Sequence, residues 1–273
     1  MNARLLLITF SILAIAAMVR SSSFPCYHPD TFTFPRTTEI GDDDMKIADN
    51  FPYNKTRLPK DIVPEMYTVW LKPDLKNTFD FCGHVKIDLK CVNATKYVIL
   101  HSKLLNITGF SLLEFNGYRV RDIRMLKNEK NDMILLKSKN DLVRGQKYKL
   151  VITFQGMLSN AVGGFYKQSY TTESGEIRYF ATTLLAPNRA RLAFPCFDEP
   201  EFKAVFQINI AHDKKLRAIS NMPLDKMIAK DNETVESRFL PSSVKMSSYL
   251  VMFAVFDFTY TETTTERGTK VSR

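Results

Sequence analysis

Short runs of alternating apolar and polar residues repeat along this chain from about residue 58 onward, and this pattern constrains the fold most strongly. In the clearest run, 81–92, Val85 and Ile87 face one way while Lys86 between them faces the other. Such alternation predicts a half-buried β-strand. Candidate strands recur at roughly ten-residue spacing, at 65–71, 81–92, 96–101, 110–114, 118–126, 133–137, 148–154, 164–170, 177–183, 205–210, 216–220, 236–240 and 247–256.

Turn residues separate these runs. Asn116-Gly117, Arg144-Gly145 and Ser174-Gly175 supply the positive φ that tight connections need, and Gly163-Gly164 is interpreted as a bend between strands. Helical periodicity is absent beyond a turn or two, although 188–194 could form one short helix. The chain is therefore predicted to be all-β, as an antiparallel sandwich or curved sheet.

One segment, residues 191–200, does not follow the alternating pattern and is interpreted as a buried corner. Its prolines fix φ and lack a backbone donor, while its aromatic residues and cysteine are of the kind found in cores. The residues that define it are Arg191, Phe194, Pro195, Cys196, Phe197, Asp198, Glu199 and Pro200.

This corner also resembles a known family signature. Ala181-Thr182-Thr183, then Pro187, then ARLAFPCFDEPEFKAVF from Ala190 to Phe206 is similar to the amino-terminal domain of the M1 family zinc aminopeptidases. The resemblance extends from about Leu58 to the end of the chain. It implies a saddle-shaped, mostly antiparallel β domain that agrees with the strand pattern.

The catalytic motifs of that family do not occur in these 273 residues. The resemblance implies a zinc helix with H-E-x-x-H, a G-A-M-E-N loop that binds the substrate's amino terminus, and a tyrosine that stabilises the intermediate. In the zinc helix two histidines bind the metal and the glutamate is the general base. None of His28, His84, His101 and His212 is followed by Glu. We expect no catalytic residue, no metal ligand and no cofactor in this chain, since zinc would belong to the catalytic domain.

Two positions before the corner depart from the family pattern. Active members commonly place an amide and then an acidic or amide residue there, which help to bind the substrate's α-ammonium group. Leu184 and Ala186 occupy these positions here. Neither side chain can accept a hydrogen bond, so no substrate-binding residue is predicted.

Other arrangements that could support chemistry are weak. Asp198 and Glu199 are adjacent in an extended segment and point opposite ways, so structural hydrogen bonding with Arg191 or Arg189 is the preferred interpretation. Cys82 with His84, and Cys26 with His28, have a C-x-H spacing that ordinary strand or loop positions explain. No nucleophile elbow of the form G-x-S-x-G is present.

The amino terminus suggests export. A basic start precedes an apolar run at residues 5–19, which at about 1.5 Å per residue is shorter than the ~30 Å hydrocarbon core. A cleavable signal peptide at 1–21 is therefore preferred, with a membrane anchor through 5–19 as the alternative. Four N-glycosylation sequons, at Asn54, Asn93, Asn106 and Asn232, fit a secreted chain.

The four cysteines allow three disulfide connectivities, and the strand pattern argues against one of them. Cys82 and Cys91 would lie about 30 Å apart on opposite faces of one strand, beyond the ~7 Å limit between Cα atoms, unless the strand broke near Gly83. Cys196 is interpreted as a buried free thiol.

Positive charge is concentrated between Arg119 and Lys149, where ten Lys or Arg residues stand against four acidic ones. The apolar residues among them have strand-like spacing, so the charges are interpreted as solvated sides of strands rather than as a site for an anionic partner. A nucleic-acid partner is not expected, because no binding motif is recognised.

These observations divide the chain into a signal peptide at 1–21, a flexible lead-in at 22–57 and an M1-type amino-terminal β domain at 58–273. We expect a secreted, glycosylated structural domain without peptidase activity of its own. Two alternatives remain: a fragment of a full-length active aminopeptidase that acts on peptides, or a secreted module that binds a catalytic domain or other protein at its exposed domain interface.

Overall fold

Strand β3 (Asp80–Cys91) shows how the sequence pattern produces the fold. Its apolar residues at alternate positions are buried, and the polar residues between them are half-buried or exposed. Its neighbours on either side, β2 (Ile62–Pro73) and β8 (Lys147–Met157), follow the same alternation. Because every second residue points to the same face, these strands build a sheet with one face in the core.

The computed structural model describes residues 38–39, 51–259 and 261–272. The chain divides into two units, 1–33 and 34–273, and every described residue lies in the second. The predicted signal peptide, Cys26, His28 and most of the lead-in therefore lie outside the described residues. Within that lead-in, β1 (Thr38–Glu39) pairs with β5 (Asn106–Glu114).

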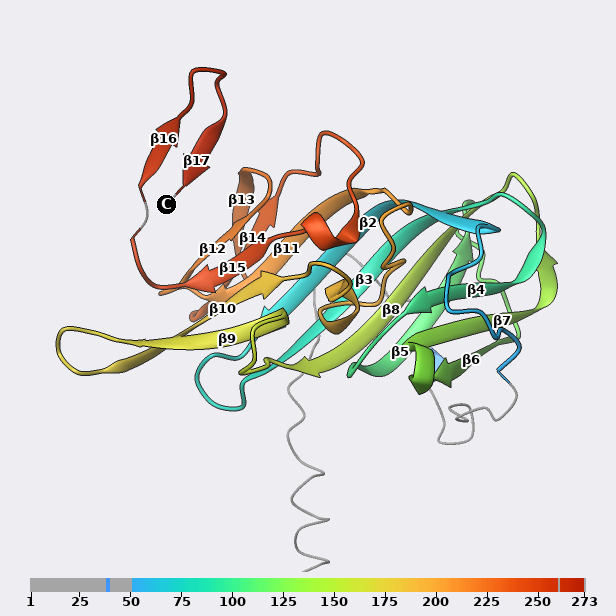
Figure 1. Cartoon of the computed structure of the whole chain (residues 1–273), viewed down its shortest axis with the longest axis horizontal. Coiled ribbons are helices and arrows are strands. Elements are labelled where there is room, and N and C mark those ends of the chain that lie inside the picture. The colour runs from blue at the N-terminus through green and yellow to red at the C-terminus, as the bar shows by residue number, and fades with distance from the viewer. Residues whose placement is uncertain (1–37, 40–50, 260, 273) are drawn as a thin grey trace, which may run out of the picture. The chain divides into compact units, whose positions relative to one another are not determined.

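The largest sheet has eight strands (Figure 1). Their order is β1, β5 (Asn106–Glu114), β8, β3, β2, β11 (Val205–Asp213), β14 (Thr234–Phe239) and β13 (Leu224–Ala229). Neighbouring strands are antiparallel except β2 and β11, which run parallel with Met66 opposite Val205.

Three smaller sheets complete the described fold. The four-stranded sheet has the order β12 (Arg217–Ser220), β15 (Phe253–Phe256), β10 (Ile177–Leu184) and β9 (Gly164–Thr171). The three-stranded sheet consists of β4 (Thr95–His101), β7 (Met133–Leu142) and β6 (Ile123–Asn128), and the two-stranded sheet of β16 (Glu262–Thr264) and β17 (Lys270–Ser272).

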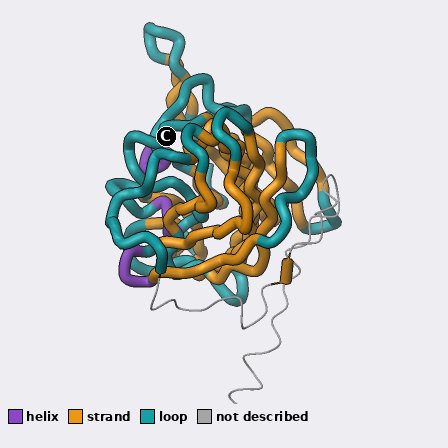
Figure 2. The backbone as a smooth tube through the Cα atoms, turned by 90° about the vertical axis from the view of Figure 1, so that its right-hand side faces the viewer, coloured by secondary structure: helices purple, strands orange, loops and turns teal. Residues whose placement is uncertain are grey.

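Helical structure among the described residues is limited to single 3-10 turns, and strands make up nearly all the regular structure (Figure 2). The turns are η1 (Glu129–Asn131), η2 (Ala190–Leu192) and η3 (Ser248–Leu250). Within this part of the chain, no helix is long and apolar enough to cross a membrane. The predicted all-β, mostly antiparallel class is confirmed.

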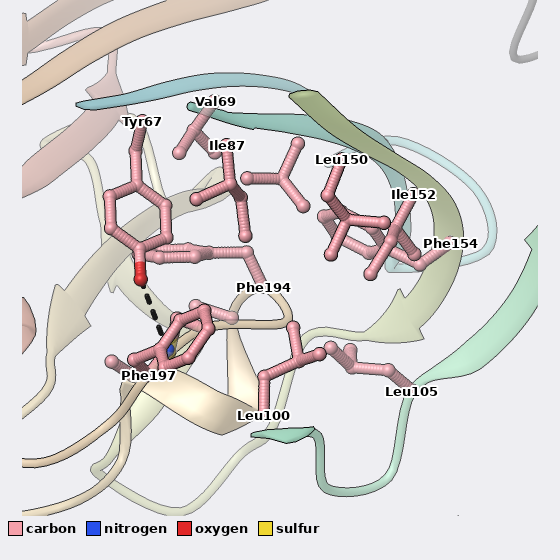
Figure 3. Packing of buried hydrophobic residues seen from close by; sticks show 14 of the residues in the cluster. Tyr67, Val69, Ile87, Leu100, Leu105, Leu150, Ile152, Phe154, Phe194 and Phe197 are labelled. Atoms are coloured by element: carbon pink, nitrogen blue, oxygen red, sulfur yellow. Dashed lines mark hydrogen bonds between the residues drawn. The ribbon is translucent and has the colours of Figure 1, made fainter. Parts of the chain in front are cut away.

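The core lies between the inner face of the large sheet and the elements packed against it (Figure 3). Tyr67, Ile87 and Ile152 from the large sheet meet Leu100 of β4 and Phe194 of the corner segment. All five side chains are buried. The corner segment is thus part of the core rather than a surface feature.

Local departures from the predicted strands have identifiable causes. The strand predicted at 118–126 begins only at Ile123, because Asp122 adopts a left-handed conformation with φ 55°. The single strand predicted at 247–256 is wrong. Its first half forms η3, which closes when Val251 donates to the Ser248 carbonyl, and only Phe253–Phe256 extends the sheet.

Candidate functional site

The corner segment, defined as Arg191–Pro200, is the candidate site because it concentrates buried charge. It starts in η2 and passes beneath the large sheet. Phe194 and Phe197 are buried and lie beside Tyr67 (Figure 3). Tyr67 in turn stacks on Phe206 with ring centroids 4.5 Å apart. These aromatic contacts hold the segment in one position against β2 and β11.

Arg191 and Asp198 form a buried ion pair across the corner. The Arg191 side-chain Nε lies 2.9 Å from Asp198 Oδ2, and the Arg191 backbone N–H donates to the same oxygen at 3.3 Å. Ser248 Oγ donates to the other oxygen, Oδ1, at 2.8 Å. Asp198 is 3% exposed, so its charge is satisfied entirely by protein groups. Arg191 also lies 3.6 Å from Asp132.

Glu199 points away from Asp198 and ties the corner to the start of the domain. Its Oε1 accepts a hydrogen bond from the Leu58 backbone N–H at 2.9 Å. Its Oε2 lies 3.6 Å from Arg57 Nη1, although that guanidinium is largely exposed. The two neighbouring carboxylates therefore have separate partners and share no reacting position. The predicted hydrogen bonding with Arg191 is confirmed for Asp198, whereas Glu199 bonds neither Arg191 nor Arg189 but Leu58 and Arg57.

Arg189, the alternative partner considered for the acidic pair, bonds elsewhere. Its Nη1 donates to the Val162 carbonyl at 2.6 Å. The guanidinium lies against Gly163, where an added Cβ would fall 2.0 Å from Nη1. Gly163 and Gly164 have φ of 136° and 72°, which confirms the predicted bend.

Backbone hydrogen bonds join the corner to two distant strands. Phe197 N–H donates to Tyr67 Oη at 3.1 Å (Figure 3). His101 N–H donates to the Cys196 carbonyl at 2.8 Å, and Cys196 N–H returns a bond to the His101 carbonyl at 3.1 Å. The corner is therefore a junction between β2 and β4.

His101, Cys196 and Tyr67 at this junction are held in their neutral forms. Burial, with smaller contributions from the cationic Arg191 and Arg57, lowers the pKa of His101 to about 3. Burial also raises the pKa values of the Cys196 thiol and the Tyr67 phenol well above their ordinary values. A neutral imidazole, thiol and phenol without solvent access are suited to packing and not to proton transfer.

Leu184 and Ala186 are exposed next to the corner. Leu184 ends β10 opposite Gly164 and is 44% exposed, and Ala186 follows it on the surface. The positions are accessible, and neither side chain has a polar atom. The prediction that they bind no ammonium group therefore stays a prediction.

The remaining cysteines and histidines serve other purposes. Cys82 is disulfide-bonded, whereas Cys91 and Cys196 are both buried free thiols. This confirms the argument against a bond between Cys82 and Cys91, and the interpretation of Cys196. His84 does not pair with Cys82 as a site, since its ring stacks on Trp70 at 5.3 Å.

Sequence reasoning missed one pairing that looks catalytic. His212 Nε2 lies 2.8 Å from Ser237 Oγ, and His212 Nδ1 lies 2.9 Å from the Asp213 carbonyl. A Ser–His pair oriented by a third group is the arrangement of an activated nucleophile. Both residues are only 2% exposed, however, so no substrate can reach the hydroxyl. Only the cross-strand register of β11 and β14 could have revealed this pair.

The donor groups present do not fit a zinc site. Among the described residues, no three His, Cys, Asp or Glu side chains lie close enough together to hold a metal ion. His101 is neutral and buried, and Asp198 is already ion-paired with Arg191. No catalytic step is therefore assigned to a metal here.

Comparison with known proteins gives a family match that covers the corner segment. The sequence pattern of the peptidase M1 N-terminal domain matches residues 63–250, which is more than half of the chain. This chain belongs to the peptidase M1 N-terminal domain family. The match includes β2, the corner segment and η3.

Relatives of this M1 domain include proteins named as aminopeptidases. Human endoplasmic reticulum aminopeptidase 1 is 39% identical over 224 residues, covering 81% of this chain and 24% of that protein. Human endoplasmic reticulum aminopeptidase 2 is 38% identical over 229 residues, and glutamyl aminopeptidase of Bitis rhinoceros is 36% identical over 225. The chain spans about a quarter of the length of these relatives.

Proposed function

We propose that this chain provides the N-terminal structural domain of an M1-type zinc aminopeptidase and does not hydrolyse peptides by itself. The family's reaction is the zinc-dependent removal of amino-terminal residues from peptides. The observation that supports the proposal is that the corner segment is intact, with Arg191 bonded to Asp198, while the 273 residues contain neither H-E-x-x-H nor G-A-M-E-N. In addition, the side chains of Leu184 and Ala186 have no polar atom that could bind the ammonium group of a substrate.

An assay of the purified full chain tests this proposal. Aminoacyl chromogenic substrates with added zinc should give no turnover above buffer, and an active M1 aminopeptidase assayed in parallel shows that the substrates are competent. The variant Leu184→Gln/Ala186→Glu should also be inactive, because the general base is still missing. Turnover by the unmodified chain that a chelator abolishes would overturn the proposal.

A second candidate is that the domain is one part of a longer, active aminopeptidase. The observation in its favour is that the matched relatives extend over roughly four times the aligned length, with 24% coverage for the two human enzymes. The full-length transcript decides it. A reading frame that continues past Arg273 into G-A-M-E-N and H-E-x-x-H supports the enzyme, whereas a stop codon supports the separate domain.

We also propose that the domain packs against a catalytic domain through an apolar patch beside the corner. The patch consists of Leu184, Leu250 and Met252, which are 44%, 50% and 37% exposed. Asn221 fixes it, since its side chain bonds the Leu250 carbonyl and the Met252 N–H. Co-purification with an M1 catalytic domain should be lost in Leu184→Asp/Leu250→Asp. It should persist in Ile177→Asp/Leu224→Asp, and equal binding by both variants would contradict the patch.

Export through the secretory pathway is the proposed localisation, with residues 1–21 as signal peptide. Two features support it. The asparagines of all four sequons are exposed, and Cys82 is disulfide-bonded, as is typical of oxidising compartments. Expression in eukaryotic cells should give secreted chain whose mass falls on glycosidase treatment. Secreted material without such a shift would contradict glycosylation, and chain retained in the membrane fraction would indicate the anchor through residues 5–19.

A further inference from the structure

A groove of about 980 Å³ lies between strands of two sheets. One wall is β5 at Phe110–Leu112, and the other is formed by β6 and by Lys137–Lys139 of β7. The segment Arg119–Asp122 closes one end. These three strands lie at the same end of the fold (Figure 1). We call this feature the basic groove.

Five cationic side chains line the groove, together with five apolar ones. Arg119, Arg121, Arg124, Lys137 and Lys139 face a single carboxylate, that of Asp122. Other than Arg119, these cations form no ion pair with a described residue. The sequence of residues 119–149 predicts that these charges are solvated sides of strands, and Lys137 is indeed exposed on β7. That interpretation does not explain why five cations line one concave surface.

The register of β6 and β7 places two of these cations opposite each other. Arg124 lies directly opposite Lys137 in the antiparallel pair. Like charges at directly opposed positions destabilise a sheet, and among the described residues neither Arg124 nor Lys137 forms an ion pair that would offset this cost. A bound anionic group between the two side chains would remove the repulsion.

The groove also has apolar and backbone components. Val120, Ile123 and Leu126 line it while packing against the core, and Phe110 and Leu112 are buried beneath. Among the described strands, β6 pairs only with β7, so its second edge presents backbone donors and acceptors. An exposed strand edge is a template for an added strand. A small anion such as phosphate would use only the charges, whereas an extended peptide would use all three features.

We propose that the basic groove binds an acidic peptide segment in extended conformation, which adds a strand to the edge of β6. Acidic side chains on one face of the peptide pair with Arg124 and Lys137, and apolar side chains on its other face contact Val120 and Ile123. The alternation of a strand places these two sets on opposite faces, as Ile123 and Arg124 are on β6.

The chain's own acidic run, Asp42–Asp44, is the nearest competing occupant. Strand β1 pairs Thr38 with Phe110 and Glu39 with Gly109, so it runs along β5 away from Ser111 and Leu112. Three consecutive aspartates would place charges on both faces of an extended strand, whereas the groove offers cations for one face and apolar side chains for the other. A partner outside the chain, with alternating acidic and apolar residues, is therefore favoured.

The test uses the full chain and a labelled, terminally blocked decapeptide of alternating Glu and Val. Blocking both termini separates this site from any recognition of a free amino terminus. The variant Arg124→Gln/Lys137→Gln should weaken binding by about tenfold or more. The control Lys90→Gln/Lys96→Gln changes the net charge equally at exposed strand positions outside the groove and should stay within about twofold. Lys139→Gln provides a second, milder variant should the double substitution disturb folding, which circular dichroism monitors.

Hydrogen exchange supplies a readout that electrostatic attraction alone would not change. Backbone amides of β6 should exchange more slowly when the peptide is bound, and the matched Gln–Val peptide should neither bind nor protect. Equal weakening by the control variant would overturn the proposal. So would tight binding of a sulfated oligosaccharide without protection of β6. A gain of peptide affinity in Asp42→Asn/Asp43→Asn/Asp44→Asn would instead identify the chain's own acidic run as the occupant.

Discussion

Arg191 and Asp198 make the most demanding contact in the corner segment, since both are charged and buried. Arg191→Met should lower the free energy of unfolding by about 3–5 kcal/mol, because it leaves the Asp198 carboxylate buried with one cationic partner fewer. Urea denaturation followed by circular dichroism measures the change. The double variant Arg191→Met/Asp198→Leu should recover part of the loss, since it leaves no buried charge uncompensated.

Arg178→Met is the matched control for this substitution. Arg178 also pairs with two carboxylates, Glu176 and Asp257, but it lies on the surface of the β9–β10 sheet. Solvent screens exposed ion pairs, so its loss should change stability far less. Equal effects of the two arginine substitutions would contradict a structural role for the corner network.

His101 should make the stability of the domain depend on pH. Its pKa is about 3 in the folded chain, against 6.5 ordinarily, because burial and nearby cations disfavour the imidazolium. The unfolded chain therefore binds a proton that the folded chain does not. The contribution of His101 to stability should be constant above pH 6.5 and fall by about 1.4 kcal/mol per pH unit from pH 6.5 toward pH 3.

His101→Gln should flatten this dependence in urea unfolding measured at several pH values. His212 contributes in the same direction, since burial lowers its pKa as well, so His101→Gln/His212→Gln should flatten it further. An unchanged slope in the double variant would show that carboxylates, and not these two imidazoles, control acid unfolding.

Strand β3 shows a packing constraint at the level of a whole element. An added Cβ at Gly83 would lie 2.6 Å from the Trp70 carbonyl oxygen and 2.9 Å from Phe154 Cζ. Backbone on the neighbouring strand cannot move aside without breaking the pairing of Leu71 with Gly83. Gly83→Ala should therefore cost about 1–3 kcal/mol of stability, and Gly83→Leu considerably more.

Gly117 is the control position for the substitutions at Gly83. Its φ of 87° strains any side chain, but nothing lies within 4 Å of an added Cβ. Gly117→Ala and Gly117→Leu should therefore cost similar amounts, about 1–2 kcal/mol each. Urea denaturation of the four variants separates overpacking, which grows with side-chain size, from backbone strain, which does not. A loss at Gly83 that did not grow with size would contradict close packing there.

The predictability of the strands depended on how each is buried. Long alternating strands such as β3 were predictable because one face is in the core and the other is not. Strand β13 (Leu224–Ala229) was not predicted, since it is an edge strand that is exposed at nearly every position and shows no alternation. The strand predicted at 247–256 failed over its first half, because 248–250 forms a 3-10 turn in which Leu250 is 50% exposed and only Ser248 is buried.

The candidate site was predictable only where its contacts are local in sequence. Arg191 and Asp198 are seven residues apart, and their pairing was anticipated. Tyr67 and Ser248 lie 130 and 50 residues from the atoms they bond, so only the tertiary fold reveals them. The parallel pairing of β2 with β11, which brings Tyr67 to the corner, has no signal in a single sequence.

The free thiols report on the integrity of the whole domain. Cys91 and Cys196 are buried, and Cys91 Sγ lies 3.0 Å from the Asn93 carbonyl oxygen. Burial raises the pKa of each thiol above its ordinary value, so the reactive thiolate is scarce in the folded chain. Neither cysteine should react with iodoacetamide at neutral pH unless the domain unfolds.

Alkylation at increasing urea, read by mass spectrometry, tests this expectation. Modification of both thiols should rise together with the unfolded fraction seen by circular dichroism, because Cys196 sits in the corner and Cys91 ends β3, and both are part of one core. A cysteine introduced by Ser174→Cys in the exposed β9–β10 turn should react at every urea concentration. Labelling of Cys91 before Cys196 would instead mean that the end of β3 opens separately, and that the domain does not unfold as a single cooperative unit.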